Sequence, residues 1–327
     1  MNQASTPLNL LVAAEEGPGA QLLRALSQTA HRVVALLSSV SGEPPAASPL
    51  GQVAKARDLP IWPAERVRDP AFADLVRKEG VDLLVNAHSL HVIHPAVLQA
   101  PRIGSFNLHP GRLPSYSGLN SISWAIYQGE STAGVTVHWM TPRIDAGPIA
   151  YEASVPIEER DTAFTLGAKC SRAGVDLLAR LIESAAADPG GIPARQQPLA
   201  ERRYYGRGAP QDGRVDWARS AVEIVRFVRA CNYGPFPSPW GQPLTTVDVD
   251  RELAILQADR TGRRSGGPPG TVGSRSGGAV EIAAADEWVL VRRVRWEGEA
   301  RDAAQVLRSG QRCAAPPNAI SSDARAT

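Results

Sequence analysis

The sequence is poor in the features that mark secreted, membrane and metal-rich proteins. It has three cysteines in 327 residues, Cys170, Cys231 and Cys313, and they lie far apart. That number and spacing predict neither a disulfide framework nor a cysteine metal pair, and they fit a reducing compartment. No apolar run approaches the roughly 18 residues of a membrane span, and the opening residues lack the basic start of a signal peptide. We therefore expect a cytoplasmic protein.

An excess of charge of one sign is also missing. Lys and Arg number 35 against 33 Asp and Glu, so a net charge of +2 provides no overall attraction to nucleic acid. With 43% hydrophobic residues, the composition is that of a globular protein with a substantial core. The glycine fingerprint of dinucleotide-binding enzymes is absent as well, because Glu16–Gly19 is only a turn motif. This disfavours a nicotinamide-dependent oxidoreductase.

Short apolar runs and helical patterns alternate over the first half of the chain. Apolar runs bounded by turn residues predict strands, and longer periodic segments predict helices. Their alternation is typical of βαβ units, so we expect an α/β domain with a mostly parallel, Rossmann-like sheet. The expected strands are Leu8–Ala13, His31–Ser39, Val81–Ala87, Ile103–His109 and Gly134–Met140, and the expected helices are Ala20–Thr29, Leu50–Arg57, Pro70–Glu79, Leu119–Gln128 and Asp161–Ala187.

The second half has fewer helical patterns. We expect a polar linker at Asp188–Ala200 and one helix at Ser220–Ala230. Val280–Ala283 and Trp288–Val294 alternate as the strands of a hairpin do. The stretch Arg260–Gly278, rich in Gly, Ser and Arg, is expected to be a mobile loop. This half is therefore expected to form a small β-rich domain.

Three polar side chains stand where apolar runs are stopped by Pro or Gly. Asn107 and His109 lie in FNLHPGRLP, and Asp145 lies in RIDAGP. In parallel sheets, ligands bind outside the carboxyl ends of the strands, and the first two residues lie at such an end. An amide, an imidazole and a carboxylate are what acyl transfer to an amine requires: an oxyanion donor, a proton handler and a partner that orients it. Taken singly, Asn107 and Asp145 could instead be turn residues.

The combination of these motifs is specific. Asn-x-His-Pro is followed by Leu-Pro and then, 36 residues after the histidine, by Asp-x-Gly-Pro. With GVTVHW between them, the motifs resemble the folate-dependent formyltransferases, which include the methionyl-tRNA and amino-sugar enzymes. The resemblance covers roughly residues 8–190, and YYGRGAPQDGRVDW extends it more weakly to about residue 240. It implies a catalytic domain over residues 1–200, a small OB-like barrel domain over 201–313 and a disordered tail over 314–327.

The resemblance implies a donor, an acceptor and roles for individual residues. The donor would be 10-formyltetrahydrofolate, the acceptor a primary amine, and no metal would be needed. Asn107 would hydrogen-bond the formyl oxygen as it becomes an oxyanion, and His109 would donate to that oxygen or shuttle the amine proton. Asp145 would hold His109 and favour its charged form. The pterin would be held, mostly by backbone and apolar groups, at Leu90, His91, Val92, Ile93, Trp139, Thr141, Pro142, Arg143 and Ile144.

Candidate acceptor contacts follow the histidine motif. They are Arg112, Ser117, Gly118 and Asn120. Alternatively, Arg112 is a solvated loop arginine, and Gly118 or Asn120 caps the following helix. The series His88-x-x-His91-x-x-His94 suggests a metal site, but its spacing is not the i, i+4 of helical zinc ligands. We predict no metal.

The nature of the amine is suggested by what the Ser38–Pro49 stretch lacks. The tRNA-acting members carry a basic loop there, as nucleic-acid binding requires, whereas this stretch has no basic residue. We therefore predict a small acceptor, either a nucleotide-linked amino sugar or a specialised-metabolite amine or hydroxylamine. The alternatives are a methionyl-tRNA formyltransferase, a formyltetrahydrofolate hydrolase, and a non-catalytic nucleotide-binding or scaffold protein with the same fold. No membrane partner is expected, and a homodimer is considered.

Overall fold

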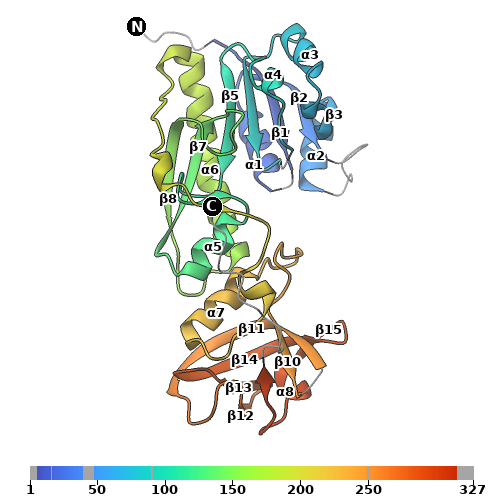
Figure 1. The fold of residues 1–327 in the computed structure, drawn as a ribbon. Coiled ribbons are helices and arrows are strands. Elements are labelled where there is room, and N and C mark those ends of the chain that lie inside the picture. The colour runs from blue at the N-terminus through green and yellow to red at the C-terminus, as the bar shows by residue number, and fades with distance from the viewer. Residues whose placement is uncertain (1–5, 16, 40–47, 90, 249–250, 315–327) are drawn as a thin grey trace. The chain divides into compact units, whose positions relative to one another are not determined.

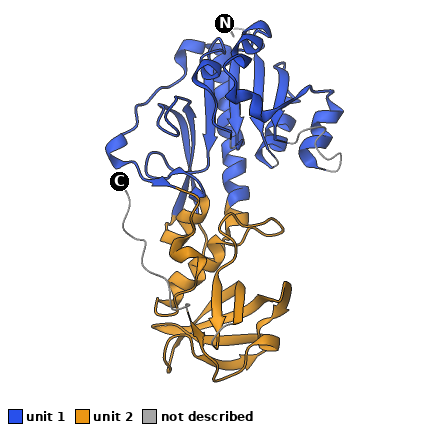
Figure 2. Ribbon diagram, turned by 45° about the vertical axis from the view of Figure 1, so that its right-hand side comes forward, with its two compact units in different colours: residues 1–121, 132–156, 167–205 blue, residues 122–131, 157–166, 206–327 orange. Residues whose placement is uncertain are grey.

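The computed structural model describes residues 6–15, 17–39, 48–89, 91–248 and 251–314. Leu90, most of the Ser38–Pro49 stretch and residues 315–327 of the expected tail 314–327 lie outside these residues, whereas Ala314 belongs to a strand. The chain forms two compact units, which Figure 2 shows in different colours. Unit 1 comprises residues 1–121, 132–156 and 167–205, and unit 2 comprises residues 122–131, 157–166 and 206–327.

Unit 1 is built on a seven-stranded sheet in the order β3-β2-β1-β4-β5-β7-β8 (Figure 1). The strands from β3 to β5 run parallel, whereas β7 pairs antiparallel with both β5 and β8. The predicted α/β class with a mostly parallel sheet is confirmed. The strands are β1 (Asn9–Ala14), β2 (Arg32–Ser38), β3 (Ile61–Pro63), β4 (Leu83–Ala87), β5 (Gly104–His109), β7 (Thr132–Trp139) and β8 (Ile149–Pro156).

The central strand β1 is buried on both faces. Leu11 and Ala13 join a core cluster that includes Phe72 and Val97 from the helices beside the sheet. Successive side chains of a strand point to opposite faces, and the alternate residue Leu10 is also fully buried. A strand covered on both faces is apolar throughout, which explains the unbroken apolar run in this part of the sequence.

The helices α1 to α4 connect the parallel strands, and all of these but the short α4 were expected from the sequence pattern. The helix α2 begins after Ser48, whose side chain accepts a hydrogen bond from the Gly51 N–H and so caps the first turn. The helices up to α6 are α1 (Pro18–Leu26), α2 (Pro49–Ala56), α3 (Phe72–Lys78), α4 (Pro95–Leu98), α5 (Ser121–Gln128) and α6 (Ala163–Ala187), with short 3-10 helices η1 (Ala64–Arg68), η2 (Pro189–Gly191) and η3 (Leu199–Glu201).

Unit 2 contains a second seven-stranded sheet, in which every strand pair is antiparallel. Its helix α7 starts with a capping box formed by Ser220 and Glu223. The elements are η4 (Pro210–Gly213), α7 (Ala221–Ala230), β10 (Leu244–Val247), β11 (Arg251–Arg264), β12 (Val272–Ser276), β13 (Ala279–Ala283), β14 (Glu287–Trp296), β15 (Glu299–Asp302), α8 (Ala303–Val306) and β16 (Cys313–Ala314).

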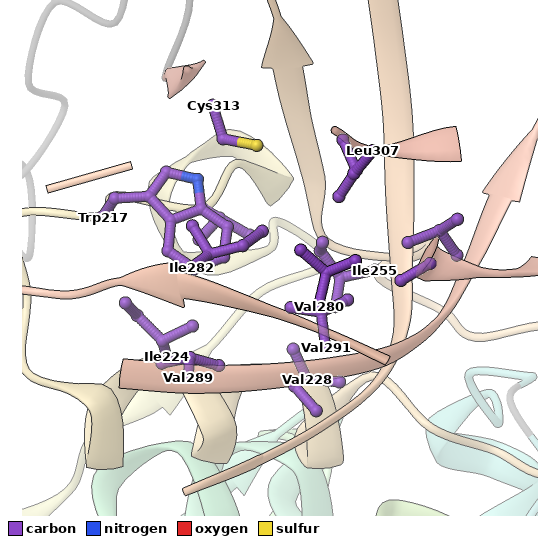
Figure 3. Close-up of a cluster of buried hydrophobic side chains, with 14 of the residues drawn as sticks. Trp217, Ile224, Val228, Ile255, Val280, Ile282, Val289, Val291, Leu307 and Cys313 are labelled. Atoms are coloured by element: carbon purple, nitrogen blue, oxygen red, sulfur yellow. The ribbon is translucent and has the colours of Figure 1, made fainter. Parts of the chain in front are cut away.

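The core of unit 2 combines side chains of α7 and of this sheet with Trp217 and Leu307, as Figure 3 shows. Ile224 and Val228 of α7 pack with Ile282 and Val289 of the neighbouring strands β13 and β14. The indole of Trp217 joins the same cluster and donates a hydrogen bond to the Thr245 hydroxyl, so its polar atom is satisfied within the core. Unit 2 therefore has a hydrophobic core of its own.

The expected mobile loop at Arg260–Gly278 is largely wrong. The strand β11 continues through its first part to Arg264, and β12 occupies Val272–Ser276. The strand β11 is held by its pairing with β14, which the composition of the segment did not predict. In this pair Arg260 donates two hydrogen bonds to the Glu287 carboxylate, over 2.8 and 3.1 Å. The strands β3 and β8 were also not among the expected elements.

Candidate active site

The strand β5 presents two of the predicted catalytic side chains on one face. Asn107 and His109 are two residues apart, so both side chains leave the strand on the same side. On the antiparallel neighbour β7, His138 lies directly opposite Asn107. The Asn107 Nδ2 donates a hydrogen bond to His138 Nε2 over 3.1 Å, and His138 Nδ1 donates to the Trp139 carbonyl oxygen over 2.8 Å.

These two bonds define the orientation of the Asn107 amide. A carbonyl oxygen can only accept, so Nδ1 of His138 carries a proton and Nε2 of the neutral ring is an acceptor. The amide therefore turns its nitrogen toward His138. Because an amide nitrogen carries two hydrogens, its second N–H can donate to a ligand.

The carboxylate of Asp145 lies between two imidazole rings. Its Oδ2 is 3.7 Å from His109 Nδ1, and its Oδ1 is 3.5 Å from His138 Nε2. The Gly118 N–H donates a hydrogen bond to Oδ2 over 2.8 Å. The other nitrogen of the His109 ring, Nε2, donates to the Tyr116 carbonyl oxygen over 2.6 Å. The amide, the imidazole and the carboxylate thus form one connected cluster, with His138 as its fourth member.

The environment keeps Asp145 ionised. Burial alone would raise its pKa, but the positive charges that His109 and His138 carry once protonated, together with the Gly118 N–H, stabilise the carboxylate and bring the pKa down to about 2. For His109, burial lowers the pKa, while Asp145 and the Tyr116 carbonyl act in the opposite direction. Neutral His109 carries its proton on Nε2 and has a free acceptor at Nδ1. A second proton taken up at Nδ1 would be stabilised by the ionised Asp145 carboxylate, 3.7 Å away.

Close packing around His109 requires glycine at position 111. A Cβ on Gly111 would lie 2.7 Å from His109 Nε2 and 2.8 Å from the Tyr116 carbonyl oxygen. Gly118 has φ +93°, a conformation that residues with a Cβ rarely adopt. These two glycines let the backbone approach the imidazole and the carboxylate closely.

The predicted acceptor contacts have different surroundings. The Arg112 guanidinium donates to the Thr132 hydroxyl over 2.9 Å, at the start of β7. The Ser117 hydroxyl is fully buried and donates to a carbonyl of its own loop. Gly118 contacts the site through its backbone N–H, and Asn120 has φ +58° just before α5. The structure brings Gly118 into the cluster and directs the Arg112 guanidinium toward β7.

The first group of predicted folate contacts follows β4. Ile93 packs in the core of unit 1, so its side chain faces away from solvent. The neighbouring Val92 is 60% exposed. His91 Nε2 lies 3.1 Å from the Ser39 hydroxyl. Its Nδ1 is buried and has no hydrogen-bond partner among the described residues. Leu90 lies outside the described residues.

The second group forms the loop between β7 and Asp145. Trp139 ends the strand, and the hydroxyl of Thr141 donates to the Arg143 carbonyl oxygen over 3.0 Å. Pro142, Arg143 and Ile144 are exposed. This loop therefore presents accessible backbone and apolar groups immediately before the carboxylate.

Two residues of the site were missing from the sequence-based set. His138 ends an apolar run, which was its one visible signal, but only the pairing of β5 with β7 places it opposite Asn107. Gln197 donates to the carbonyl oxygens of Asp145 and Gly147, over 3.0 and 2.6 Å. It lies 52 residues after Asp145 in an expected linker, and no local pattern marks it.

Among the described residues, no group of three or more His, Cys, Asp and Glu side chains is arranged to hold a metal ion. Within the same residues, no helix combines the length and the apolar character needed to cross a bilayer.

His88 makes the stability of the fold sensitive to acid. Burial, followed by the charge of His109, lowers the pKa of His88 to about 4. An unfolded chain with the ordinary value of 6.5 binds more protons between these values, so stability falls as the pH drops from 6.5 to 4. Asparagine tolerates the φ of +70° at this position. We therefore expect His88→Asn to lose less free energy of unfolding on acidification than the wild type, by on the order of 2 kcal/mol.

The measurement is urea unfolding of the wild type and the variant at about pH 7 and pH 4.5. His94→Asn is the matched control, since His94 caps α4 by accepting from the Ala96 N–H and asparagine can also cap a helix. Equal losses on acidification in the wild type and His88→Asn would contradict the prediction.

Two family models match the chain. The family model described as "Formyl transferase" matches residues 11–182, and the model described as "Formyl transferase, C-terminal domain" matches residues 209–312. Asn107, His109, His138 and Asp145 all lie in the first match.

Solved structures share the fold at low sequence identity. HypX from Aquifex aeolicus matches with a TM-score of 0.63 and 19% identity, over 92% of this chain and 47% of that chain. This chain thus spans about half the length of HypX. WlaRD, a sugar 3N-formyl transferase, matches with a TM-score of 0.63 and 14% identity, over 89% and 98% of the two chains. An N-formyltransferase from Helicobacter canadensis matches with a TM-score of 0.62 and 17% identity, over 87% and 98%.

Proposed function

The chain belongs to the formyl transferase family, and from that premise we propose that it transfers the formyl group of 10-formyltetrahydrofolate to a primary amine of a small acceptor. The observation that carries the proposal is the cluster of Asn107, His109 and Asp145, linked through His138. An amide N–H beside an imidazole and a carboxylate whose pKa is about 2 supplies what formyl transfer requires.

In this reaction Asn107 stabilises the charge that develops on the formyl oxygen. As the amine nitrogen bonds to the formyl carbon, one electron pair of the C=O bond moves to oxygen, and an Asn107 N–H donates to it. Cleavage of the bond from the formyl carbon to N10 of the folate restores C=O. A single well-placed donor of this kind lowers the barrier by about 3–4 kcal/mol.

His109 and Asp145 handle the proton. The amine loses one proton and N10 gains one, so the transfer balances without a metal, an oxidant or a reductant. His109 accepts the proton at Nδ1, where the Asp145 carboxylate, 3.7 Å away, stabilises the imidazolium. No activated serine or cysteine is needed, because a neutral amine is itself a nucleophile.

Residues of the two predicted folate-binding segments suit a reduced pterin. The exposed side chains of Val92 and Ile144 suit the apolar faces of the ring. The buried Nδ1 of His91, which lacks a partner among the described residues, suits an N–H donor such as those of the pterin. HypX has been solved with tetrahydrofolic acid bound, and WlaRD with 5-N-formyl-THF, on the same fold.

The acceptor we propose to test first is a nucleotide-linked amino sugar. The Helicobacter canadensis protein was solved with folinic acid and dTDP-3-aminofucose, and WlaRD in the presence of dTDP. The stretch Ser38–Pro49 has no basic residue, so it lacks the charge that tRNA binding requires. Initiator methionyl-tRNA remains the second candidate.

The test incubates purified protein with 10-formyltetrahydrofolate and a panel of nucleotide-linked amino sugars, free amines, hydroxylamines and initiator methionyl-tRNA. Folate release and the product mass are followed together. We expect an N-formyl product with at least one small acceptor and loss of that product in His109→Ala. Formate release without an N-formyl product would indicate a hydrolase, and undiminished turnover in His109→Ala would refute the mechanism.

A further inference from the structure

Residues 197–205, here called the strap, contact the two loops that form the carboxylate site. At one end of the strap, β9 (Tyr204–Tyr205) pairs in parallel with β6 (Ser117–Gly118). The Ser117 N–H donates to the Arg203 carbonyl oxygen over 3.0 Å, and the Leu119 N–H donates to the Tyr205 carbonyl oxygen over 2.8 Å. Both neighbours of Gly118 are thus fixed by the strap, and the Gly118 N–H is the group that donates to Asp145.

Two further residues of the strap hold the turn that carries Asp145. The Gln197 Nε2 donates to the carbonyl oxygens of Asp145 and Gly147, and the Arg202 Nη2 donates to the Ile144 carbonyl oxygen over 3.2 Å. Gln197 is only 8% exposed, so both of its bonds are shielded from water. One amide therefore bridges the two sides of the turn.

This turn needs support from outside itself. Asp145 has φ +53°, in the left-handed region that residues with a Cβ rarely occupy. Such a conformation persists only when the surrounding structure determines it. Water could replace the two carbonyl contacts of Gln197 but would not fix the turn, because a water molecule is not tied to the chain.

We propose that Gln197 is a positioning residue for formyl transfer: by bridging the Asp145 and Gly147 carbonyls, it holds the Asp145 carboxylate between the imidazoles of His109 and His138. This inference rests on the proposed function. The hydrogen bonds of Gln197 go to backbone carbonyls of the turn, so its effect on the reaction would pass through Asp145.

The test compares Gln197→Met with Gln196→Met. Methionine keeps an unbranched side chain of similar length but cannot donate to the two carbonyls. Gln196 is its exposed neighbour, so the same substitution there is a matched control. We expect kcat of Gln197→Met to fall about 10-fold or more, with the KM of both substrates within threefold of the wild type, and Gln196→Met to be unchanged.

A pH profile separates positioning from a general structural role. The charged or titratable groups that face His109 are Asp145, His138 and His88. With the carboxylate displaced, His109 loses an attraction at 3.7 Å, and the limb of the kcat/KM profile that reports His109 should move to lower pH by about one unit. A fall in kcat without this shift, or no change in either quantity, would overturn the proposal.

Hydrogen exchange of the Gly118 amide gives a readout that needs no activity. Its N–H donates to Asp145 in the wild type, so we expect faster exchange in Gln197→Met and an unchanged rate in Gln196→Met. If the wild type formylates no acceptor, the proposed function fails. The exchange rate of the Gly118 amide still tests whether Gln197 holds the Asp145 turn. Equal exchange rates in the wild type and Gln197→Met would refute that role. Should Gln197→Met not fold, Gln197→Asn, one methylene shorter, is expected to give smaller changes in the same directions, and wild-type behaviour in it would refute the bridge.

Discussion

Replacing Asn107 with alanine is expected to slow formyl transfer by about 10²–10³-fold, with little change in the affinity for the folate donor. In the structure the Asn107 amide is oriented before any substrate binds, because His138 Nε2 accepts one of its N–H groups. A donor that is already aligned loses little free energy to reorganisation when the oxyanion forms. Alanine removes that donor and leaves His109 and Asp145 in place.

The control for Asn107→Ala is the isosteric Asn107→Asp. Aspartate has nearly the same shape but carries only acceptor atoms when ionised, so it would repel the developing oxyanion. We expect it to be at least as slow as the alanine variant. Single-turnover rates with saturating folate measure the effect, and fluorescence titration measures folate affinity. A rate within threefold of the wild type for either variant would mean that Asn107 is not the oxyanion donor.

The second large effect is expected for Asp145→Asn, which should lower kcat by about 10³-fold or more, by analogy with the removal of a histidine-orienting aspartate elsewhere. The substitution keeps the shape of the side chain and removes its charge. At neutral pH this charge is present in the wild type, because the pKa of Asp145 is about 2. Without it, burial disfavours the imidazolium of His109, and the hydrogen bond to the Tyr116 carbonyl alone acts in the opposite direction.

A buried aspartate outside the cluster provides the control for Asp145→Asn. Asp161 is 4% exposed and accepts hydrogen bonds from the Glu158 N–H and the Thr165 hydroxyl. Asp161→Asn is expected to change thermal stability and to leave kcat within threefold of the wild type. If Asp145→Asn kept more than a tenth of wild-type kcat while remaining folded, the carboxylate would have no essential part in proton handling.

The sequence predicted four of the five parallel strands of unit 1, namely β1, β2, β4 and β5, because they lie in largely apolar runs. A strand buried from both sides shows as a continuous apolar run, as around Leu10 of β1. In unit 2 the same approach failed at Arg260, which belongs to a strand because β11 pairs with β14 and the Glu287 carboxylate accepts a hydrogen bond from its guanidinium. The composition of the segment predicts neither interaction, since both partners are distant in sequence.

Some residues of the candidate site could likewise be predicted from the sequence, and others could not. The sequence by itself determined which groups could do the chemistry, because Asn107 and His109 are two residues apart on one strand and Asp145 follows in a motif of its own. Only the tertiary structure placed His138 opposite Asn107 and tied Gln197 to the turn of Asp145. The physical reason is that strand register and hydrogen bonds across 52 residues are consequences of packing, which leaves no local pattern in the sequence.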